Sequence, residues 1–312
     1  MFRPSVVLSC YNGSKYIIGQ LDSLRRQSRP LDEVIISDDF SSDNTSQIAS
    51  RYIVDYDLNN WHLSRNSTNK GWKRNFHELI KNANGDLIFL CDQDDIWMQN
   101  KVESMVNVME EHSDIDVLAC SVEPFYESGS QKVTSQNSMS GLDSDNIIYQ
   151  RIDDKSVYVQ RPGCSFCIRR SFAQQIEPYW DDSWAHDAVL WALSEAKGSL
   201  VRYDKRLVRF RRHEGNASAR KRMAQRDRVR DLRRLSERTE LMELFGDNCA
   251  SLSANDRATL EDTMKWLESR IRFLETPSLS SLGGAISGRR HYLTSKGLPV
   301  DILLGLFHGA SL

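Results

Sequence analysis

The sequence lacks several features that would assign it to common protein classes. It has no excess of charge of one sign, because 41 Lys and Arg residues are balanced by 43 Asp and Glu and the formal net charge is -2. A protein that binds nucleic acid over its whole surface is strongly basic, so we expect no nucleic-acid partner. No apolar run approaches the roughly 20 residues of a membrane-spanning helix, and the segment "MFRPSVVLSC" lacks a signal-peptide core. We therefore expect a cytoplasmic protein.

Cysteine is also sparse, with six residues in 312. The only close pair is Cys164 and Cys167, and no second pair of this kind or suitably spaced pair of histidines accompanies it. A structural zinc site needs four such ligands, so the sequence argues against one. We interpret the pair as two thiols in one strand of a protein from a reducing compartment.

Two glycine-rich nucleotide motifs are missing as well. No G-x-G-x-x-G follows the first apolar run, and no G-x-x-x-x-G-K-[ST] occurs anywhere. Dinucleotide-dependent dehydrogenases and P-loop hydrolases depend on these loops to hold phosphate groups. A nucleotide bound by this chain would instead be held by carboxylates and a metal ion.

What the first half does contain is a regular alternation of apolar runs and helical patterns. Strand and helix alternating at this spacing predict crossover units, a largely parallel sheet and helices on both faces. The fold class expected is therefore α/β with a Rossmann-like sheet. Strands are predicted over residues 6–10, 33–39, 61–65, 86–91 and 116–120, and helices over 14–27 (with Ser14 as N-cap), 42–53, 71–83 and 100–112.

The second half is less regular. Residues 127–146 are rich in Ser, Gly and Asn, which is typical of a loop. A strand leading into a helix is predicted over 163–176, a helix over 186–199 and a strand over 206–218. From residue 218 the composition becomes that of long, arginine-rich helices. We expect a catalytic domain over 1–217, a helical appendage over 218–275 and a C-terminal tail over 276–312.

Polar clusters follow three of the predicted strands. They are Tyr11-Asn12-Gly13, Asp38-Asp39 and the Asp92-Gln93-Asp94-Asp95 turn. Ligands of parallel α/β sheets bind beyond the carboxyl ends of the strands, so these clusters are expected to share one crevice.

The stretch "LIFLCDQDDIW" places three carboxylates directly after a buried strand. Like charges this close repel one another unless a cation neutralises them. Mg²⁺ and Mn²⁺ prefer oxygen ligands, and Mg²⁺ commonly combines one or two carboxylates with phosphate and water. Asp94, with Asp92 nearby, is therefore a candidate metal ligand. The alternative is that Asp94 or Asp95 caps the following helix.

Four segments together resemble a known family. "VVLSCYNGSKYI", "IISDDFSSDNT", "NKGWKRNF" and "CDQDDIW" occur in the order and spacing of the family 2 glycosyltransferases, which have the GT-A fold. The "CDQDDIW" form is most similar to bacterial enzymes of cell-surface polysaccharide and cell-wall assembly, including rhamnosyltransferases. The resemblance covers roughly residues 4–217.

The resemblance implies roles for individual residues. Asp39 would read the base of a nucleotide-sugar, flanked by Ser9, Tyr11 and Asn12, and Asp92 would lie near the ribose. Asp94, in the position of the family's DXD motif, would bind Mn²⁺ or Mg²⁺, and His213 matches a residue that helps to hold the metal or diphosphate. Asp187 matches the catalytic base, Gly163 matches an acceptor-side turn, and the family inverts the anomeric carbon. Four basic residues are further candidates for contacts with the diphosphate: Lys70, Arg74, Arg212 and Arg211. The alternative is that their side chains are solvated at the surface.

The chemistry agrees with this assignment. Breaking the bond to a nucleoside diphosphate develops negative charge, which a bound cation stabilises. The acceptor is an alcohol, so a second carboxylate must remove its proton. Asp94 and Asp187 supply the two carboxylates, although Asp187 alone would equally suit a helix N-terminus. Four tryptophans are candidates for stacking on sugar rings: Trp97, Trp180, Trp184 and Trp191. The alternative is that they lie in the apolar core.

The arginine-rich stretch 220–238 and the apolar tail segment "GLPVDILLGLF" bear on partners. Asp227, Asp231 and Glu237 interrupt the basic run, so a solvated helix face is the default interpretation. Attraction to anionic lipid at the inner face of a membrane is the alternative, and it would suit a lipid-linked saccharide or other glycan acceptor. The tail would then lie in the membrane interface or pack on the appendage. The oligomeric state is left open.

Two other functions remain compatible with the residues taken alone. The first is a metal-dependent phosphohydrolase with Asp92 as nucleophile and Asp94 as acid. The second is a catalytically inactive binding module that recruits partners through its basic helix.

Overall fold

The computed structural model describes residues 1–127, 143–213, 224–249 and 252–306. The chain divides into two compact units. Unit 1 comprises Met1–Tyr149, Gln160–Leu190 and Ser199–Asn216, and unit 2 comprises Gln150–Val159, Trp191–Gly198 and Ala217–Leu312. Much of the predicted loop 127–146 falls outside the described residues.

Unit 1 is built on one mixed sheet. Its strands lie in the order β3-β2-β1-β4-β8-β6-β9-β5, and β7 pairs with β9. The strands are β1 (Pro4–Cys10), β2 (Glu33–Asp38), β3 (Trp61–Arg65), β4 (Leu87–Asp92), β5 (Ile96–Trp97), β6 (Val117–Tyr126), β7 (Ile147–Tyr149), β8 (Phe166–Arg169) and β9 (Leu200–Arg212).

The sheet is parallel only over part of its width. β3, β2, β1 and β4 run parallel to one another, as predicted. β8 then runs antiparallel to both β4 and β6. It follows the 3-10 turn η2 (Gly163–Ser165) directly, and an antiparallel neighbour needs no helical crossover. The predicted α/β fold class, with helices on both faces of the sheet, is confirmed.

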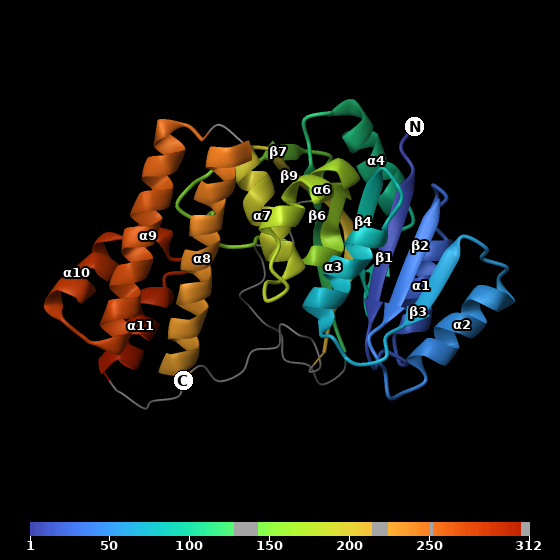
Figure 1. Cartoon of the computed structure of the whole chain (residues 1–312), viewed down its shortest axis with the longest axis horizontal. Coiled ribbons are helices and arrows are strands. Elements are labelled where there is room, and N and C mark those ends of the chain that lie inside the picture. The colour runs from blue at the N-terminus through green and yellow to red at the C-terminus, as the bar shows by residue number, and fades with distance from the viewer. Residues whose placement is uncertain (128–142, 214–223, 250–251, 307–312) are drawn as a thin grey trace. The chain divides into compact units, whose positions relative to one another are not determined.

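The helices cover the two faces of the parallel strands. On one face, α1 (Ile17–Arg25), α2 (Thr45–Asp55) and α4 (Lys101–Glu111) contribute to a single apolar core with Val6, Leu8 and Cys10 of β1. On the other face, α3 (Trp72–Asn82) packs across β1 and β2, and α6 (Arg170–Ile176) packs beside α3 (Figure 1). α7 (His186–Lys197) begins after the short turn η3 (Glu177–Tyr179).

The expected N-cap of the first helix is wrong. α1 begins at Ile17, and its N-cap is Tyr16 rather than Ser14. The backbone N–H groups of Tyr16 and Ile17 both donate to the carbonyl of Gly13, which forms a turn before the helix. The Ser14 N–H instead donates to Asp43 Oδ2 at 3.1 Å.

Unit 2 is helical. It contains α8 (Gln225–Cys249), α9 (Ala254–Glu275), α10 (Leu279–Ser287), the turn η4 (Arg289–His291) and α11 (Gly297–Leu306). The apolar tail segment forms α11 and packs on α9, with Leu304 fully buried. Among the described residues, no helix is long and apolar enough to cross a bilayer.

A buried ionic network ties these helices together. Asp301 of α11 is fully buried and accepts hydrogen bonds from Arg228 Nε at 2.8 Å, Arg270 Nε at 2.6 Å and the Tyr292 hydroxyl at 2.8 Å. The Arg270 guanidinium also lies over the rings of Trp266 and Tyr292. The single carboxylate therefore joins α8, α9 and α11.

Candidate active site

The strand register brings the three predicted polar clusters together. Ser9 of β1 lies opposite Ser37 of β2 on one side and opposite Asp92 of β4 on the other. The segments that follow these strands therefore leave the same edge of the sheet next to one another. The predicted common location of the clusters is thus observed.

The turn after β1 is held by side chains from the turn after β2. Asn12 has a positive φ of 48°, a backbone conformation that asparagine tolerates better than most residues. Its Oδ1 accepts from the Ser42 N–H at 2.8 Å, and its own N–H donates to Ser41 Oγ at 2.9 Å. The Asn12 side chain is therefore committed to shaping this turn.

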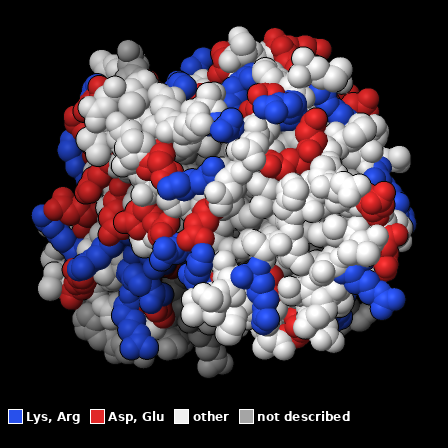
Figure 2. All heavy atoms as spheres, turned by 45° about the vertical axis from the view of Figure 1, so that its right-hand side comes forward, with Lys and Arg blue, Asp and Glu red and all other residues white. Residues whose placement is uncertain are grey.

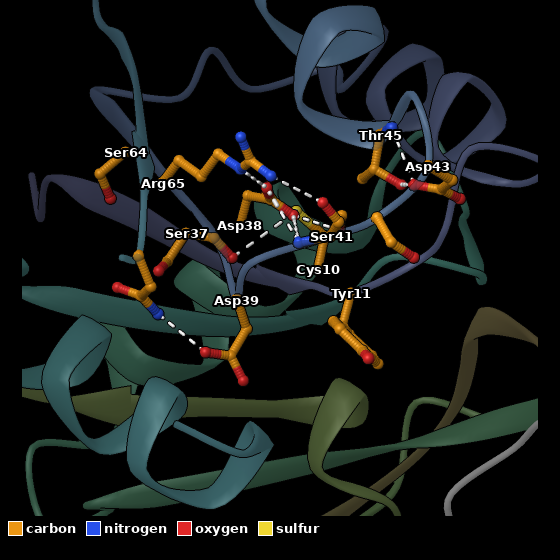
Figure 3. Close-up of polar contacts among 12 residues, drawn as sticks. Cys10, Tyr11, Ser37, Asp38, Asp39, Ser41, Asp43, Thr45, Ser64 and Arg65 are labelled. Atoms are coloured by element: carbon orange, nitrogen blue, oxygen red, sulfur yellow. Dashed lines mark hydrogen bonds and ion pairs between the residues drawn. The ribbon is translucent and has the colours of Figure 1, made fainter. Parts of the chain in front are cut away.

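The adjacent carboxylates Asp38 and Asp39 point in different directions (Figure 3). Asp38 is fully buried, pairs with Arg65 at 3.2 Å and accepts from the Ser41 hydroxyl. Asp39 and Tyr11 project together to the other side of the chain. Asp38 therefore has a structural role, while Asp39 lies on the side of Tyr11, away from these contacts.

Backbone donors at the start of α3 hold the Asp39 carboxylate. Oδ1 accepts from the Lys70 N–H at 2.8 Å and from Asn66 Nδ2 at 2.9 Å, and Oδ2 accepts from the Gly71 N–H at 2.8 Å. Gly71 adopts a φ of 83°, which suits glycine. These contacts orient the carboxylate and leave acceptor capacity on Oδ2.

Two amide side chains that the sequence interpretation missed connect the strand ends. The Gln93 amide donates to the Tyr11 carbonyl and accepts from the Tyr11 N–H, both at 2.9 Å. Asn75 of α3 is buried and donates to Ser9 Oγ at 2.8 Å while accepting from Ser37 Oγ at 2.6 Å. Both residues lie inside the motifs quoted above, but their types alone do not reveal these bridging roles.

The carboxylate turn after β4 carries strongly perturbed side chains. Burial and the charges of Asp95 and Asp94 raise the pKa of Asp92 well above its usual range. Burial and the Asp94 charge raise the pKa of Asp95 to about 7. Neither Asp94 nor Asp95 caps a helix, since β5 follows them and α4 begins only at Lys101. The helix-cap alternative is therefore wrong.

The end of β9 reaches this turn. His213 Nε2 lies 2.7 Å from Asp94 Oδ2. The Arg211 N–H donates to Asp95 Oδ1 at 2.9 Å, and the Arg211 Nε donates to the Asp94 carbonyl at 2.7 Å. Arg212 is buried, with its guanidinium over the Phe210 ring. Of the two arginines, Arg211 is the one that contacts the acidic turn in these hydrogen bonds.

The donor atoms at this turn fit a divalent cation. Carboxylate oxygens of Asp92 and Asp95 and the Cys164 sulfur all lie within 4.8 Å of one another. Asp95 Oδ2 is buried and has no hydrogen-bond partner among the described residues. Mg²⁺ and Mn²⁺ favour oxygen over sulfur, so the carboxylates of this turn suit such an ion better than Cys164 does. The Asp94–His213 pair borders the same turn.

Asp187 lies in the first turn of α7 and is half-buried. Its charge contributes to the raised pKa of Asp92. The preceding His186 is buried, and neither ring nitrogen has a hydrogen-bond partner within the part of the chain that the structure describes. Its ring packs on Phe76 at a centroid distance of 4.0 Å, and its Nε2 faces Gly163 so closely that a Cβ there would lie 2.3 Å away.

Two predicted phosphate contacts make other interactions. The Lys70 ammonium pairs with Glu78, and Arg74 Nε lies 3.1 Å from Glu78 Oε1. Lys70 therefore contributes its backbone N–H to Asp39, while both cationic groups face a carboxylate of α3. Among the tryptophans, Trp97 and Trp191 lie in the core, and Trp180 stacks on His77.

A family comparison decides the class of protein. The model of glycosyl transferase family 2 matches residues 5–175, which is more than half of the chain. The chain belongs to glycosyl transferase family 2. This glycosyltransferase is therefore an enzyme, and the phosphohydrolase and inactive-module alternatives lose their support.

Curated relatives of this glycosyltransferase are named as sugar transferases. The dTDP-rhamnosyl transferase RfbG of Shigella flexneri is 25% identical over 220 residues, covering 67% of this chain and 72% of that protein. The poly(ribitol-phosphate) beta-N-acetylglucosaminyltransferase TarS of Staphylococcus aureus is 35% identical over 118 residues, covering 37% of this chain and 20% of TarS. The matching region is less than half the length of two of these relatives. It covers 20% of TarS and 45% of the putative glycosyltransferase EpsE of Bacillus subtilis.

Solved structures share the fold of this glycosyltransferase. S. aureus TarS 1–349 in complex with UDP-GlcNAc has a TM-score of 0.65 at 20% identity and covers 97% of this chain and 87% of TarS 1–349. The mannosyltransferase PcManGT of Pyrobaculum calidifontis, in complex with GDP-Man and Mn²⁺, has a TM-score of 0.54 at 13% identity, covering 98% of this chain and 84% of that chain. The GT-A type of fold expected from the sequence is confirmed.

Proposed function

We propose that this chain is a metal-dependent, inverting glycosyltransferase that moves a hexose or deoxyhexose from a nucleoside diphosphate to a hydroxyl of a cell-surface glycan precursor. One observation carries the proposal: the carboxylates of the 92–95 turn lie beside His213 and within electrostatic reach of Asp187. The proposed leaving-group site and the proposed proton acceptor would then serve the same reaction centre. Rhamnose is one candidate sugar, because a relative is named as a dTDP-rhamnosyl transferase.

The proposed metal ligands are Asp94 and His213, with Asp92 and Asp95 adjacent. A bound Mn²⁺ or Mg²⁺ would neutralise the charge that develops on the departing diphosphate. The raised pKa values of Asp92 and Asp95 fit this role, because closely spaced buried carboxylates accept negative charge only next to a cation. Arg211 supports the site by fixing the backbone of Asp94 through its Nε–H.

The proposed base is Asp187, which would accept the proton of the acceptor hydroxyl as that oxygen attacks the anomeric carbon. The donor would be held by Ser9, Tyr11 and Asn12 after β1, by Asp39 at the base and by Asp92 at the ribose. The orientation of Asp39 by the N–H groups of Lys70 and Gly71 supports its role, because a carboxylate fixed in place discriminates hydrogen-bond donors of a base. Arg74 and Arg212 have other contacts, so we assign them no direct part.

For the acceptor, we propose a glycan or lipid-linked saccharide presented at the cytoplasmic face of a membrane. Arg226, Arg230, Arg233 and Arg234 line one depression on α8, although Arg230 pairs with Asp227 and Arg233 with Glu275. On the face drawn in Figure 2, basic groups are bordered by acidic ones. Sedimentation with anionic vesicles tests this contact: Arg226→Gln with Arg234→Gln should reduce binding, and no binding by the parent protein would contradict it.

The transferase proposal is tested with a panel of nucleotide-sugars that includes dTDP-rhamnose and UDP-GlcNAc, each incubated with Mn²⁺ and acceptor. Release of nucleoside diphosphate that depends on the divalent ion and on acceptor supports it. Binding of every donor without release of nucleoside diphosphate, or release of inorganic phosphate alone, would contradict it.

A further inference from the structure

The segment that leads into Asp187 is fastened to α3 by charged side chains. His77 of α3 has one ring nitrogen, Nδ1, 2.6 Å from Asp182 Oδ1 and the other, Nε2, 2.9 Å from Glu177 Oε2. The two carboxylates belong to residues 177–185, which precede α7. The imidazole therefore bridges two points of this segment.

This geometry specifies the protonation state of His77. A carboxylate only accepts hydrogen bonds, so a nitrogen facing one must carry a proton. Both ring nitrogens of His77 face carboxylates, and only the imidazolium form donates from both. His77 is also shielded, because its side chain is 13% exposed and Trp180 stacks on it at 4.6 Å with the rings 7° apart. Trp180 therefore holds the face of the charged ring, and the two carboxylates hold its two nitrogens.

Other groups of α3 support the same segment. Lys81 Nζ donates to Glu177 Oε1 at 2.6 Å, Arg74 Nε lies 3.7 Å from Asp182 Oδ2, and the Lys73 ammonium donates to the Ser183 carbonyl. Burial opposes ionisation of Glu177, but hydrogen bonds from Lys81 and His77 lower its pKa overall. Lys81, Glu177, Trp180 and Arg170 of α6 also line a cavity of about 210 Å³ next to His77.

α3 contacts both ends of the proposed catalytic machinery. The residues at its N-terminus donate to Asp39 through the Lys70 and Gly71 N–H groups. Trp72, the first residue of α3, and Phe76, one turn later, pack on His186, next to Asp187. The contacts of His77 add the third attachment, just before α7. The helix thus determines where Asp187 lies relative to the donor-binding side.

We propose that His77 is a positioning residue: as an imidazolium shared by Glu177 and Asp182, it fixes the 177–185 segment and thereby the position of Asp187. The inference rests on the proposed role of Asp187 as base. Displacing a catalytic group by about 1 Å can cost on the order of 100-fold in rate. Loss of the bridge should therefore reduce kcat, while the donor side, which His77 does not touch, is unaffected.

The test compares His77→Phe, which retains a ring for Trp180 but removes both N–H donors, with His77→Lys, which retains a positive charge. We expect His77→Phe to lower kcat by about 10- to 100-fold with the donor Kd within about threefold of the parent. His77→Lys should recover most of that loss. Arg51→Gln, which breaks an exposed ion pair with Asp55 on α2, is the matched control and should leave kcat unchanged.

Rescue by a second cation separates positioning from mere stability. The charged groups around the imidazole are Glu177 and Asp182 from the segment, Arg74 and Lys81 from α3, and Arg170 from α6. A kcat that His77→Lys does not recover would overturn the proposal.

If His77→Phe does not fold, Asp182→Asn provides the same test, because this side chain is 45% exposed and its loss leaves the ring in place. An unchanged kcat in Asp182→Asn and in a folded His77→Phe would also overturn the proposal. Asp187→Asn, measured in parallel, separates the base role of Asp187 from the positioning role of His77. Normal turnover in Asp187→Asn would refute the base role itself. A loss of kcat confined to Asp187→Asn would refute only the role of His77.

Discussion

His213 Nε2 and Asp94 Oδ2 lie 2.7 Å apart although 119 positions separate the two residues. The contact follows from the pairing of β9 with the short strand β5, in which Trp97 lies opposite Val208 and Ile96 opposite Arg209. The end of β9 therefore reaches back to the turn that precedes β5. A proposed metal ligand from the end of unit 1 thus contacts a carboxylate from its middle.

His213→Ala should weaken the requirement for metal rather than abolish activity. Loss of a side chain that ligates or orients a metal site costs roughly 10- to 100-fold in metal affinity. We expect the Mn²⁺ concentration for half-maximal activity to rise by about that factor. His62→Ala, at an exposed histidine of β3, is the control and should change nothing. An unchanged Mn²⁺ requirement in His213→Ala would exclude His213 from the site.

Asp187→Asn should retain donor binding and lose turnover. Removing a general base costs about 10²- to 10⁴-fold, so kcat should fall by that factor with the donor Kd within about threefold. Asp256→Asn, at an acidic residue in the first turn of α9, is the matched control for a carboxylate that only caps a helix. Asp256→Asn should lower stability slightly and leave kcat unchanged. If Asp187→Asn behaves in the same way, Asp187 only stabilises the helix terminus and is not the base.

Gly163→Ala should reduce both stability and kcat. The new Cβ would lie 2.3 Å from His186 Nε2, and Phe76 and Trp72 limit the movement of that ring. Overpacking of this kind costs about 1 to 3 kcal/mol. Gly19→Ala, which has open space around its Cβ, should not destabilise the protein. Adding His186→Ala to Gly163→Ala should relieve the overlap, and strictly additive losses would show that the two residues do not interact.

The buried His186 predicts a pH-dependent stability. Burial lowers the pKa of its imidazole, so the unfolded chain binds the proton more readily than the folded protein does. The stabilisation is present above the unfolded value of about 6.5 and is lost as the pH falls below it, by at most about 1.4 kcal/mol per pH unit. His186→Phe should have a shallower slope in urea denaturation between about pH 6.5 and 5. Equal slopes would contradict the neutral, buried assignment.

Asp301→Asn should destabilise the helical unit. The substitution keeps the shape of the side chain but leaves the buried Arg270, together with Arg228, without its counter-charge. Breaking a buried ion pair from one side costs about 3 to 5 kcal/mol. Chemical denaturation followed by circular dichroism measures the loss. Glu261→Gln, in an exposed pair with Lys265 at 3.8 Å, is the control, and a loss in Asp301→Asn no larger than in this control would contradict the network.

Much of unit 1 is predictable from local patterns. Its buried strands are short apolar runs, and β1 is buried at every position, as expected of a strand covered on both faces. The helices after β1, β2 and β3 have apolar residues at helical spacing. The convergence of Tyr11, Asp39 and Asp94 follows from a general rule for parallel sheets and needs no knowledge of side-chain packing.

Other features depend on contacts that no local pattern encodes. The antiparallel course of β8 is decided by its pairing with β4 and β6, because its apolar sequence would suit either direction. The approach of Arg74 to Asp182 depends on the path of residues 177–185. His77 belongs to none of the motifs in the sequence. Its proposed role follows only from its contacts with Glu177 and Asp182.

The most direct test of the central claim is calorimetric titration of the parent protein and Asp94→Ala with dTDP and with UDP, each in Mn²⁺ and in EDTA. We predict that Mn²⁺ tightens binding of at least one of these nucleotides to the parent by about tenfold or more, which corresponds to about 1.4 kcal/mol or more, and that it has no effect on Asp94→Ala. Equal affinity in Mn²⁺ and EDTA for the parent, or an undiminished effect of Mn²⁺ on Asp94→Ala, would contradict the claim that this turn holds the cation that engages the diphosphate.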